Sequence, residues 1–151
     1  MTRGDKALVI LLRILGVSAL FALVAVFMPL SWMAATHRWL GLGEMPAAPV
    51  AEYLARSLSA LYALFGAYCL VVASDLERYR PVVRFLGVAL ALVGFILLGV
   101  DIGAGMPWWW SAFEGPLWVG VGALILVLAR PGHKPCKQEE TPCQPPATSP
   151  S

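Results

Sequence analysis

Four long apolar stretches, separated by short polar segments, fill most of this 151-residue chain. A helix needs about 20 mainly apolar residues to cross the hydrocarbon core of a bilayer. Each stretch reaches that length once its flanking residues are added. The pattern predicts an all-α fold, that of a polytopic membrane protein with a bundle of four transmembrane helices. The expected helices span about residues 8–30, 51–74, 82–101 and 108–129.

The composition departs from that of an ordinary soluble protein. Charged residues make up 13% of the chain and hydrophobic ones 59%, whereas a soluble domain has roughly 25% charged residues. The four helices occupy residues 1–130, so we predict one membrane domain and no separate soluble domain. Residues 131–151 contain six prolines and few apolar side chains. Such a segment cannot form a core, and we predict a disordered Pro-rich cytoplasmic tail.

A cleaved signal peptide is the alternative interpretation of the first stretch, because Arg3 and Lys6 precede its apolar run. The run is longer than the 7–15 residues typical of a signal peptide. Trp32 or Met33 would also occupy the third position before a cleavage at Ala34 or Ala35. We therefore interpret the stretch as a retained transmembrane helix.

Positive charges divide unevenly between the two sides of these helices. One side has Arg38 and Arg56, and the other has nine positive residues: Arg3, Lys6, Arg13, Arg78, Arg80, Arg84, Arg130, Lys134 and Lys137. The side rich in Lys and Arg usually faces the cytoplasm. We predict a multi-pass protein of the bacterial inner (cytoplasmic) membrane with both termini in the cytoplasm.

Aromatic residues gather on the opposite side, where indole rings favour the headgroup region. They are Trp32, Trp39, Tyr53, Trp108, Trp109 and Trp110. Residues 31–40 also have the pattern of a helix lying on the membrane, ended by Gly41 and Gly43. Pro81 suits the first turn of the third helix. Pro116 predicts a kink or a broken first turn in the fourth.

Small residues mark one face on each of the two middle helices. The third helix has Gly87, Ala91, Gly94, Leu98 and Asp101 on one face, and the second has Arg56, Ser59, Ala63, Gly66 and Leu70. Lipid provides no hydrophobic drive between helices, so helices in membranes meet where small residues let their backbones approach. We predict that these two faces point inward.

Each of these faces ends in a charge on the outer side, which predicts a polar cluster there. The candidate site residues are Arg56, Asp101, Glu114 and His37. Charges at membrane depth usually face the bundle or each other, so an Arg56–Asp101 ion pair is one hypothesis. Independent solvated charges at the interface, and a role in substrate binding or proton handling, are the alternatives.

No pattern in the sequence indicates catalysis, a cofactor or a metal. The spacing of His and acidic residues matches no metal or phosphate motif. Cys69 is interpreted as a small packing residue, and Cys136 and Cys143 lack the second pair of a zinc site. The chain also has no basic stripe with interleaved aromatics, so we predict no nucleic-acid partner.

The layout resembles small bacterial four-helix membrane proteins of the DoxX-like kind. The matching segments are residues 13–16 (Arg-Ile-Leu-Gly) and residues 101–107, the turn before the fourth helix. The resemblance implies the four-helix fold. Some DoxX-like proteins are linked to quinone or thiol redox systems, but this chain has no cysteine pair or quinone-site motif that matches.

We predict a non-catalytic subunit or interaction partner embedded in the lipid bilayer, within a homo-oligomer or a larger membrane complex. Two other functions stay open. One is a transporter- or permease-like component with an outward-facing polar site, and the other is a quinone-linked redox subunit of the membrane.

Overall fold

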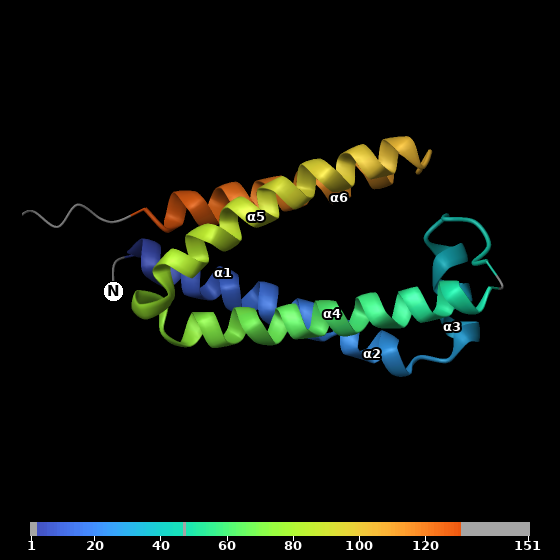
Figure 1. The fold of residues 1–151 in the computed structure, drawn as a ribbon, viewed down its shortest axis with the longest axis horizontal. Helices are drawn as coiled ribbons and strands as arrows, with labels where there is room; N and C mark the ends of the chain where they lie inside the picture. The colour runs from blue at the N-terminus through green and yellow to red at the C-terminus, as the bar shows by residue number, and fades with distance from the viewer. Residues whose placement is uncertain (1–2, 47, 131–151) are drawn as a thin grey trace, which may run out of the picture.

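A computed structural model describes residues 3–46 and 48–130 of the chain (Figure 1). Within those residues the regular structure is helical, without strands. The helices are α1 (Arg3–Leu20), α2 (Ala22–Phe27), α3 (Leu30–Trp39), α4 (Pro49–Ser74), α5 (Leu76–Gly103) and α6 (Trp108–Leu128). The prediction for residues 131–151 lies outside the described residues.

Four of these segments are long and apolar enough to cross a membrane, which confirms the predicted all-α membrane fold. The first span runs over Arg3–Phe27 and joins α1 to α2 across a turn at Phe21. There the Phe21 amide divides its hydrogen bond between the carbonyls of Val17 and Ser18. The regular ladder is interrupted at this point, and the span therefore consists of two helical pieces.

The spans pack as two helical hairpins (Figure 1). The first hairpin comprises α1, α2 and α4, and the second comprises α5 and α6. Within the first, Gly16 faces Gly66: a Cβ atom added to Gly66 would lie 2.5 Å from the carbonyl oxygen of Gly16. That distance is shorter than van der Waals contact, so only glycine permits the two backbones to come this close.

The second hairpin has two close glycine–glycine contacts of the same kind. A Cβ on Gly94 would lie 2.7 Å from the Gly115 oxygen, and one on Gly122 would lie 2.5 Å from the Gly87 oxygen. Both glycine pairs are buried. The predicted small-residue faces are confirmed as packing faces. However, the face on α5 packs against α6, and the face on α4 packs against α1 and α2.

The two hairpins meet mainly at one end of the molecule, which we call the clamped end. It is where α1 begins, α4 meets α5, and α6 ends. The buried apolar core lies on this side and comprises Leu8, Leu12, Cys69, Val72, Ala73, Leu76, Val83, Leu86, Leu90, Ile125 and Ala129. Few contacts between the hairpins occur elsewhere.

Two polar contacts reinforce the clamped end. Asp5, which is 7% exposed, forms a salt bridge of 2.7 Å with Arg80 and so joins α1 to α5. The Arg84 guanidinium donates to the carbonyl of Ala129 at 3.2 Å, at the last turn of α6. A helix C-terminus leaves carbonyl groups without partners, and Arg84 satisfies one of them.

At the other end, which we call the open end, the hairpins diverge (Figure 1). This end has α3 and the turn of residues 104–107. As predicted from residues 31–40, α3 is a short helix, with Trp32 and Trp39 exposed. Gly41 and Gly43 then adopt positive φ angles of 71° and 86°, which end it.

The two prolines expected to mark helix starts lie inside their helices instead. Helix α5 begins at Leu76, so Pro81 lies inside it and not in its first turn. The Asp75 side chain accepts a hydrogen bond from the Arg78 amide at 3.2 Å and caps the new start. Helix α6 continues through Pro116, and its first turn is intact.

Candidate functional site

The four residues of the predicted polar cluster are distributed over separate parts of the fold. His37 belongs to α3, and its Nδ1 atom contacts the carbonyl of Gly43 at 3.1 Å. This contact lies within the link that follows α3. His37 therefore has a local role in shaping that link.

Arg56 is engaged entirely within the first hairpin. Its guanidinium forms a salt bridge of 2.9 Å with Glu52, one turn earlier on α4. It also donates to the carbonyls of Val26 and Met28, at the end of α2. Cations near a helix C-terminus interact favourably with its free carbonyls and dipole. Arg56 thus fastens the end of the first span to α4.

Asp101 and Glu114 belong to the second hairpin. Asp101 is 6% exposed, and its Oδ2 atom has no hydrogen-bond partner among the described residues. Glu114 accepts a hydrogen bond from the indole nitrogen of Trp110, one turn earlier on α6. Neither carboxylate forms a salt bridge with Arg56, whose acidic partner is Glu52.

The hypothesis of an Arg56–Asp101 ion pair is therefore wrong, and the packing explains why. Each residue lies at the end of a small-residue face, as the sequence indicates. The two faces pack against different helices, one against α1 and α2 and the other against α6. Since the hairpins diverge at the open end, the two charges remain in separate hairpins.

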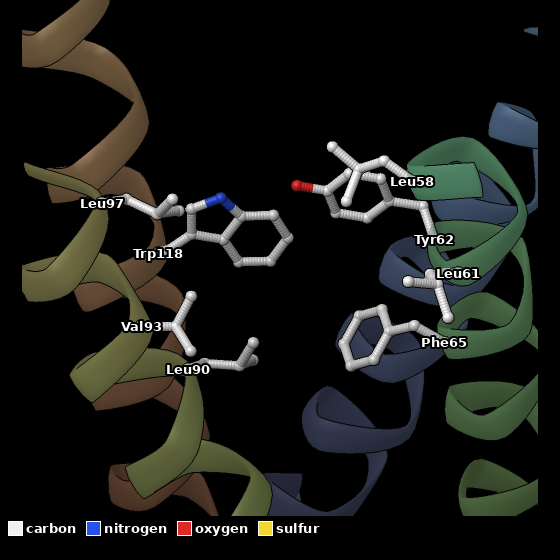
Figure 2. A pocket seen from close by; sticks show the side chains of 8 residues that line it. All are labelled: Leu58, Leu61, Tyr62, Phe65, Leu90, Val93, Leu97 and Trp118. Carbon is white, nitrogen blue, oxygen red and sulfur yellow. The ribbon is translucent and has the colours of Figure 1, made fainter. Parts of the chain in front are cut away.

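Instead, the structure places an apolar cleft between the hairpins (Figure 2). One wall is α4, and the other is formed by α5 and α6. The lining side chains are Leu58, Leu61, Tyr62, Phe65, Leu90, Val93, Leu97 and Trp118. The cleft has a volume of about 240 Å³. It begins at the core of the clamped end, near Phe65 and Leu90, and extends towards the open end.

Polar side-chain atoms of two lining residues lie at the open-end side of this cleft. The Tyr62 hydroxyl points from α4 across the cleft towards Trp118, whose indole nitrogen lies at the same level on the opposite wall (Figure 2). No hydrogen bond of the described residues engages either group. Glu114 is one turn before Trp118 on α6 and is not among the residues that line the cleft. The cleft is thus apolar at depth and polar near its upper end.

The link after α3 approaches the second hairpin at the open end. A Cβ atom on Gly41 would lie 3.9 Å from the Trp109 ring, so this link reaches the start of α6. Trp109 in turn contacts Trp110 edge to face, with ring centroids 5.6 Å apart. The consecutive tryptophans therefore connect the first outer link to the residue that binds Glu114.

Sequence reasoning missed the cleft because its lining residues resemble ordinary lipid-facing side chains. One signal was present in Trp118. Tryptophan in membrane helices is enriched at the two interfaces, whereas Trp118 is in the middle of α6. An indole N–H at that depth needs a partner or a polar cavity, and its position could have pointed to this site.

The described residues contain no group of three His, Cys, Asp or Glu side chains that could hold a metal ion. Cys69 is fully buried in the core of the clamped end. His133, Cys136 and Cys143 lie outside the described residues. What the site offers is therefore an apolar cavity with hydrogen-bonding groups at one end.

Comparisons with protein families, with curated proteins and with solved structures find no match for this chain. The resemblance to DoxX-like proteins stays an expectation from the sequence.

Proposed function

We propose that this chain is a non-catalytic membrane protein that binds a membrane-embedded partner in the cleft between its two hairpins. The observation that carries the proposal is the cleft itself. Each hairpin is closely packed through glycines, but between them bulky side chains such as Leu61 and Trp118 face an unfilled space. Apolar cavities with a few well-placed polar groups are the usual form of a binding site.

The transporter and redox alternatives receive less support from the geometry. A polar transport path needed Arg56, Asp101 and Glu114 close together, yet Arg56 is held by Glu52 and the end of α2. A thiol-based redox role needs a cysteine pair, and Cys69 is isolated within the described residues. A protein that binds a partner without catalysing a reaction requires neither a polar transport path nor a cysteine pair.

The charge distribution supports an orientation for the molecule in a bacterial cytoplasmic membrane. The clamped end holds Arg3, Lys6 and the segment with Arg78, Arg80 and Arg84, and the side rich in positive charge faces the cytoplasm. The cleft then lies around the middle of the membrane, since Leu61 and Trp118 are near the midpoints of α4 and α6. Reporter fusions at residues 44, 78, 104 and 140 should read outside, inside, outside and inside, and any other order would contradict this orientation.

Purification of the full chain in a mild detergent, with identification of all bound lipids and proteins, tests the binding function. Leu61 lines the cleft and is 60% exposed, whereas Leu64 is 67% exposed and does not line it. Leu61→Trp should fill the cleft and remove the bound partner, and Leu64→Trp should retain it. If both variants and the wild type carry the same bound molecules, the cleft is not the binding site.

A further inference from the structure

Asp101 is a buried acidic residue on α5, near the end of the third membrane span. It is 6% exposed, and its Oδ2 atom has no hydrogen-bond partner among the described residues. Charged residues inside membrane helices are costly and almost always pair with another group. The packing of the described residues provides no such group for Asp101.

The other acidic residues that are buried or half-buried in the described part of the chain each have a partner. The pairs are Asp5–Arg80, Glu52–Arg56 and Glu114–Trp110. Removing a carboxylate from water without a compensating partner is unfavourable, and the penalty is large when the group is ionised. Asp101 is therefore the exception in a fold that otherwise pairs its covered carboxylates.

The first turn of α6 lies opposite Asp101. Leu98 precedes Asp101 by about one turn on the same face of α5, and it contacts Gly115: a Cβ atom added to Gly115 would lie 2.8 Å from the Leu98 Cβ. Ser111 precedes Gly115 by about one turn on the same face of α6. Because the two helices are antiparallel, Asp101 and Ser111 lie at the same level on facing sides of the hairpin.

The Ser111 hydroxyl lacks the hydrogen bond that serines on α4 make. Ser57 and Ser59 donate to the carbonyls four residues earlier in their helix. For Ser111 that acceptor is Pro107, whose carbonyl already accepts from the amides of Trp110 and Ser111. No described residue bonds to the Ser111 hydroxyl. Two oxygen-bearing side chains without partners therefore face each other in the second hairpin.

We propose that Asp101 binds one small monovalent cation, a sodium ion or a proton, and that the Ser111 hydroxyl is the second oxygen of this site. The site is separate from the cleft and goes beyond the binding function proposed there. A bound cation neutralises a carboxylate charge that is costly away from water. The ligand is small because the protein covers Asp101 almost completely.

A divalent metal ion does not suit this site. Calcium and magnesium take about six to eight ligands, mostly oxygens. The described residues contain no group of three His, Cys, Asp or Glu side chains that could hold such an ion. One carboxylate and one hydroxyl match a single positive charge better than a double one.

Few other ionisable groups lie near Asp101, so its contribution can be isolated. On α6, the helix that covers it, the one ionisable residue is Glu114, which accepts a hydrogen bond from Trp110. The link after α3 reaches Trp109 and contains the exposed Glu44. Glu114 and Glu44 therefore provide matched controls for the removal of a carboxylate.

The stability of the full chain in detergent, measured against sodium concentration and against pH, tests the proposal. N-methylglucamine replaces sodium so that ionic strength stays constant. A ligand of the folded state stabilises it, and above the Kd a tenfold rise in cation concentration should raise the ratio of folded to unfolded protein up to about tenfold. The readout is the difference between the wild type and Asp101→Asn, because all other titrating groups are common to both.

This difference should grow with sodium concentration or as the pH falls. A response to sodium at constant pH identifies a sodium ion, and a response to pH alone identifies a proton. Ser111→Ala should weaken the affinity for the cation about two- to tenfold, as expected for one lost hydrogen bond. Glu44→Gln and Glu114→Gln should retain the full response.

If the wild type and Asp101→Asn respond alike to sodium and to pH, Asp101 binds no cation. If Glu114→Gln abolishes the response and Asp101→Asn retains it, the site is at Glu114 and the proposal is wrong. If Asp101→Asn does not fold, the wild type is compared with Ser111→Ala, and equal cation responses of these two proteins overturn the proposal.

Discussion

Gly16 and Gly66 are held so close that neither can carry a side chain. A Cβ on Gly66 would lie 2.5 Å from the Gly16 carbonyl oxygen and 2.8 Å from the Leu20 amide nitrogen. Both neighbours are backbone atoms, so no side-chain rotation can relieve the overlap. The first hairpin would have to separate or tilt to accept even a methyl group.

We therefore expect Gly66→Ala to lower the stability of the protein by about 1–3 kcal/mol, the usual cost of overpacking. Gly99→Ala is the control, because a Cβ at Gly99, also within a spanning helix, meets no atom within 4 Å. There the better helix propensity of alanine should leave stability unchanged or slightly higher. Thermal unfolding in detergent measures the stability of both variants. Equal unfolding temperatures for Gly66→Ala and Gly99→Ala would contradict the close crossing of α1 and α4.

Arg56 acts within the first hairpin, which predicts how its substitutions combine with others. In double-mutant cycles, Arg56→Gln and Asp101→Asn should be additive within about 0.3–0.5 kcal/mol, because the two residues share no partner. Arg56→Gln and Glu52→Gln should be non-additive, because their side chains form a salt bridge at 2.9 Å. Thermal stability in detergent is the readout. If the coupling energy between Arg56 and Asp101 exceeds the coupling energy between Arg56 and Glu52, the two hairpins close at the open end.

At the scale of elements, helix α5 is longer than its apolar stretch. It begins at Leu76 with the Asp75 cap and includes the polar turn that positions Arg80 and Arg84. Arg80 reaches Asp5 on α1, and Arg84 reaches the end of α6. The first three turns of α5 therefore connect three spans at the clamped end.

Loss of the cap should loosen these connections. Asp75→Ala removes the acceptor for the Arg78 amide, and we expect a loss of about 1 kcal/mol of stability. Ser74→Ala is a suitable control, since the Ser74 hydroxyl bonds only to the Val71 carbonyl in its own helix. Amide hydrogen exchange should increase at residues 76–80 in Asp75→Ala and not in the control. Unchanged protection would show that packing alone maintains this turn.

Residue periodicity was sufficient to predict the spans and their packing faces, but not the partner of each face. The 3.6-residue period placed Gly87 and Gly94 on one side of the third helix, and both are buried. It cannot indicate which neighbour covers that side. Because both faces were expected to point inward, the charges at their outer ends suggested the incorrect Arg56–Asp101 pair.

The start of α5 was missed for a different reason. Pro81 favours the first turn of a helix because its missing N–H is not needed there. Here it occupies the sixth position of α5. The Asp75 cap, together with the burial of Leu76 in the core, outweighs the bond lost at Pro81. Tertiary contacts of this kind cannot be deduced from local sequence.

The molecule as a whole has its two ends built differently. The clamped end combines the apolar core with the Asp5–Arg80 salt bridge and the contact from Arg84 to the last turn of α6. Towards the open end the cleft separates the hairpins, and the link after α3 approaches Trp109. Each hairpin is tied internally by glycine contacts and is therefore the more rigid unit. Relative motion should concentrate between the hairpins.

This asymmetry predicts how distances across the molecule will vary. Spin labels at Tyr53 on α4 and Ile102 on α5, both exposed, measure the separation of the hairpins at the open end. Labels at Ile102 and Phe113, also exposed, measure the interior of the second hairpin. With the native cysteines replaced, double electron–electron resonance in lipid nanodiscs should give a broad distribution for the first pair and a narrow one for the second.

Breaking the clamp should broaden the first distribution further. Asp5→Asn removes the charge partner of Arg80 near the point where the hairpins join, and a small change of angle there becomes a large displacement at the far end of two long helices. Filling the cleft with Leu61→Trp should shift the same distribution, whereas Leu64→Trp should not, because Leu64 does not line the cleft. If the two label pairs give equally narrow distributions, and Asp5→Asn changes neither, the hairpins form one rigid body.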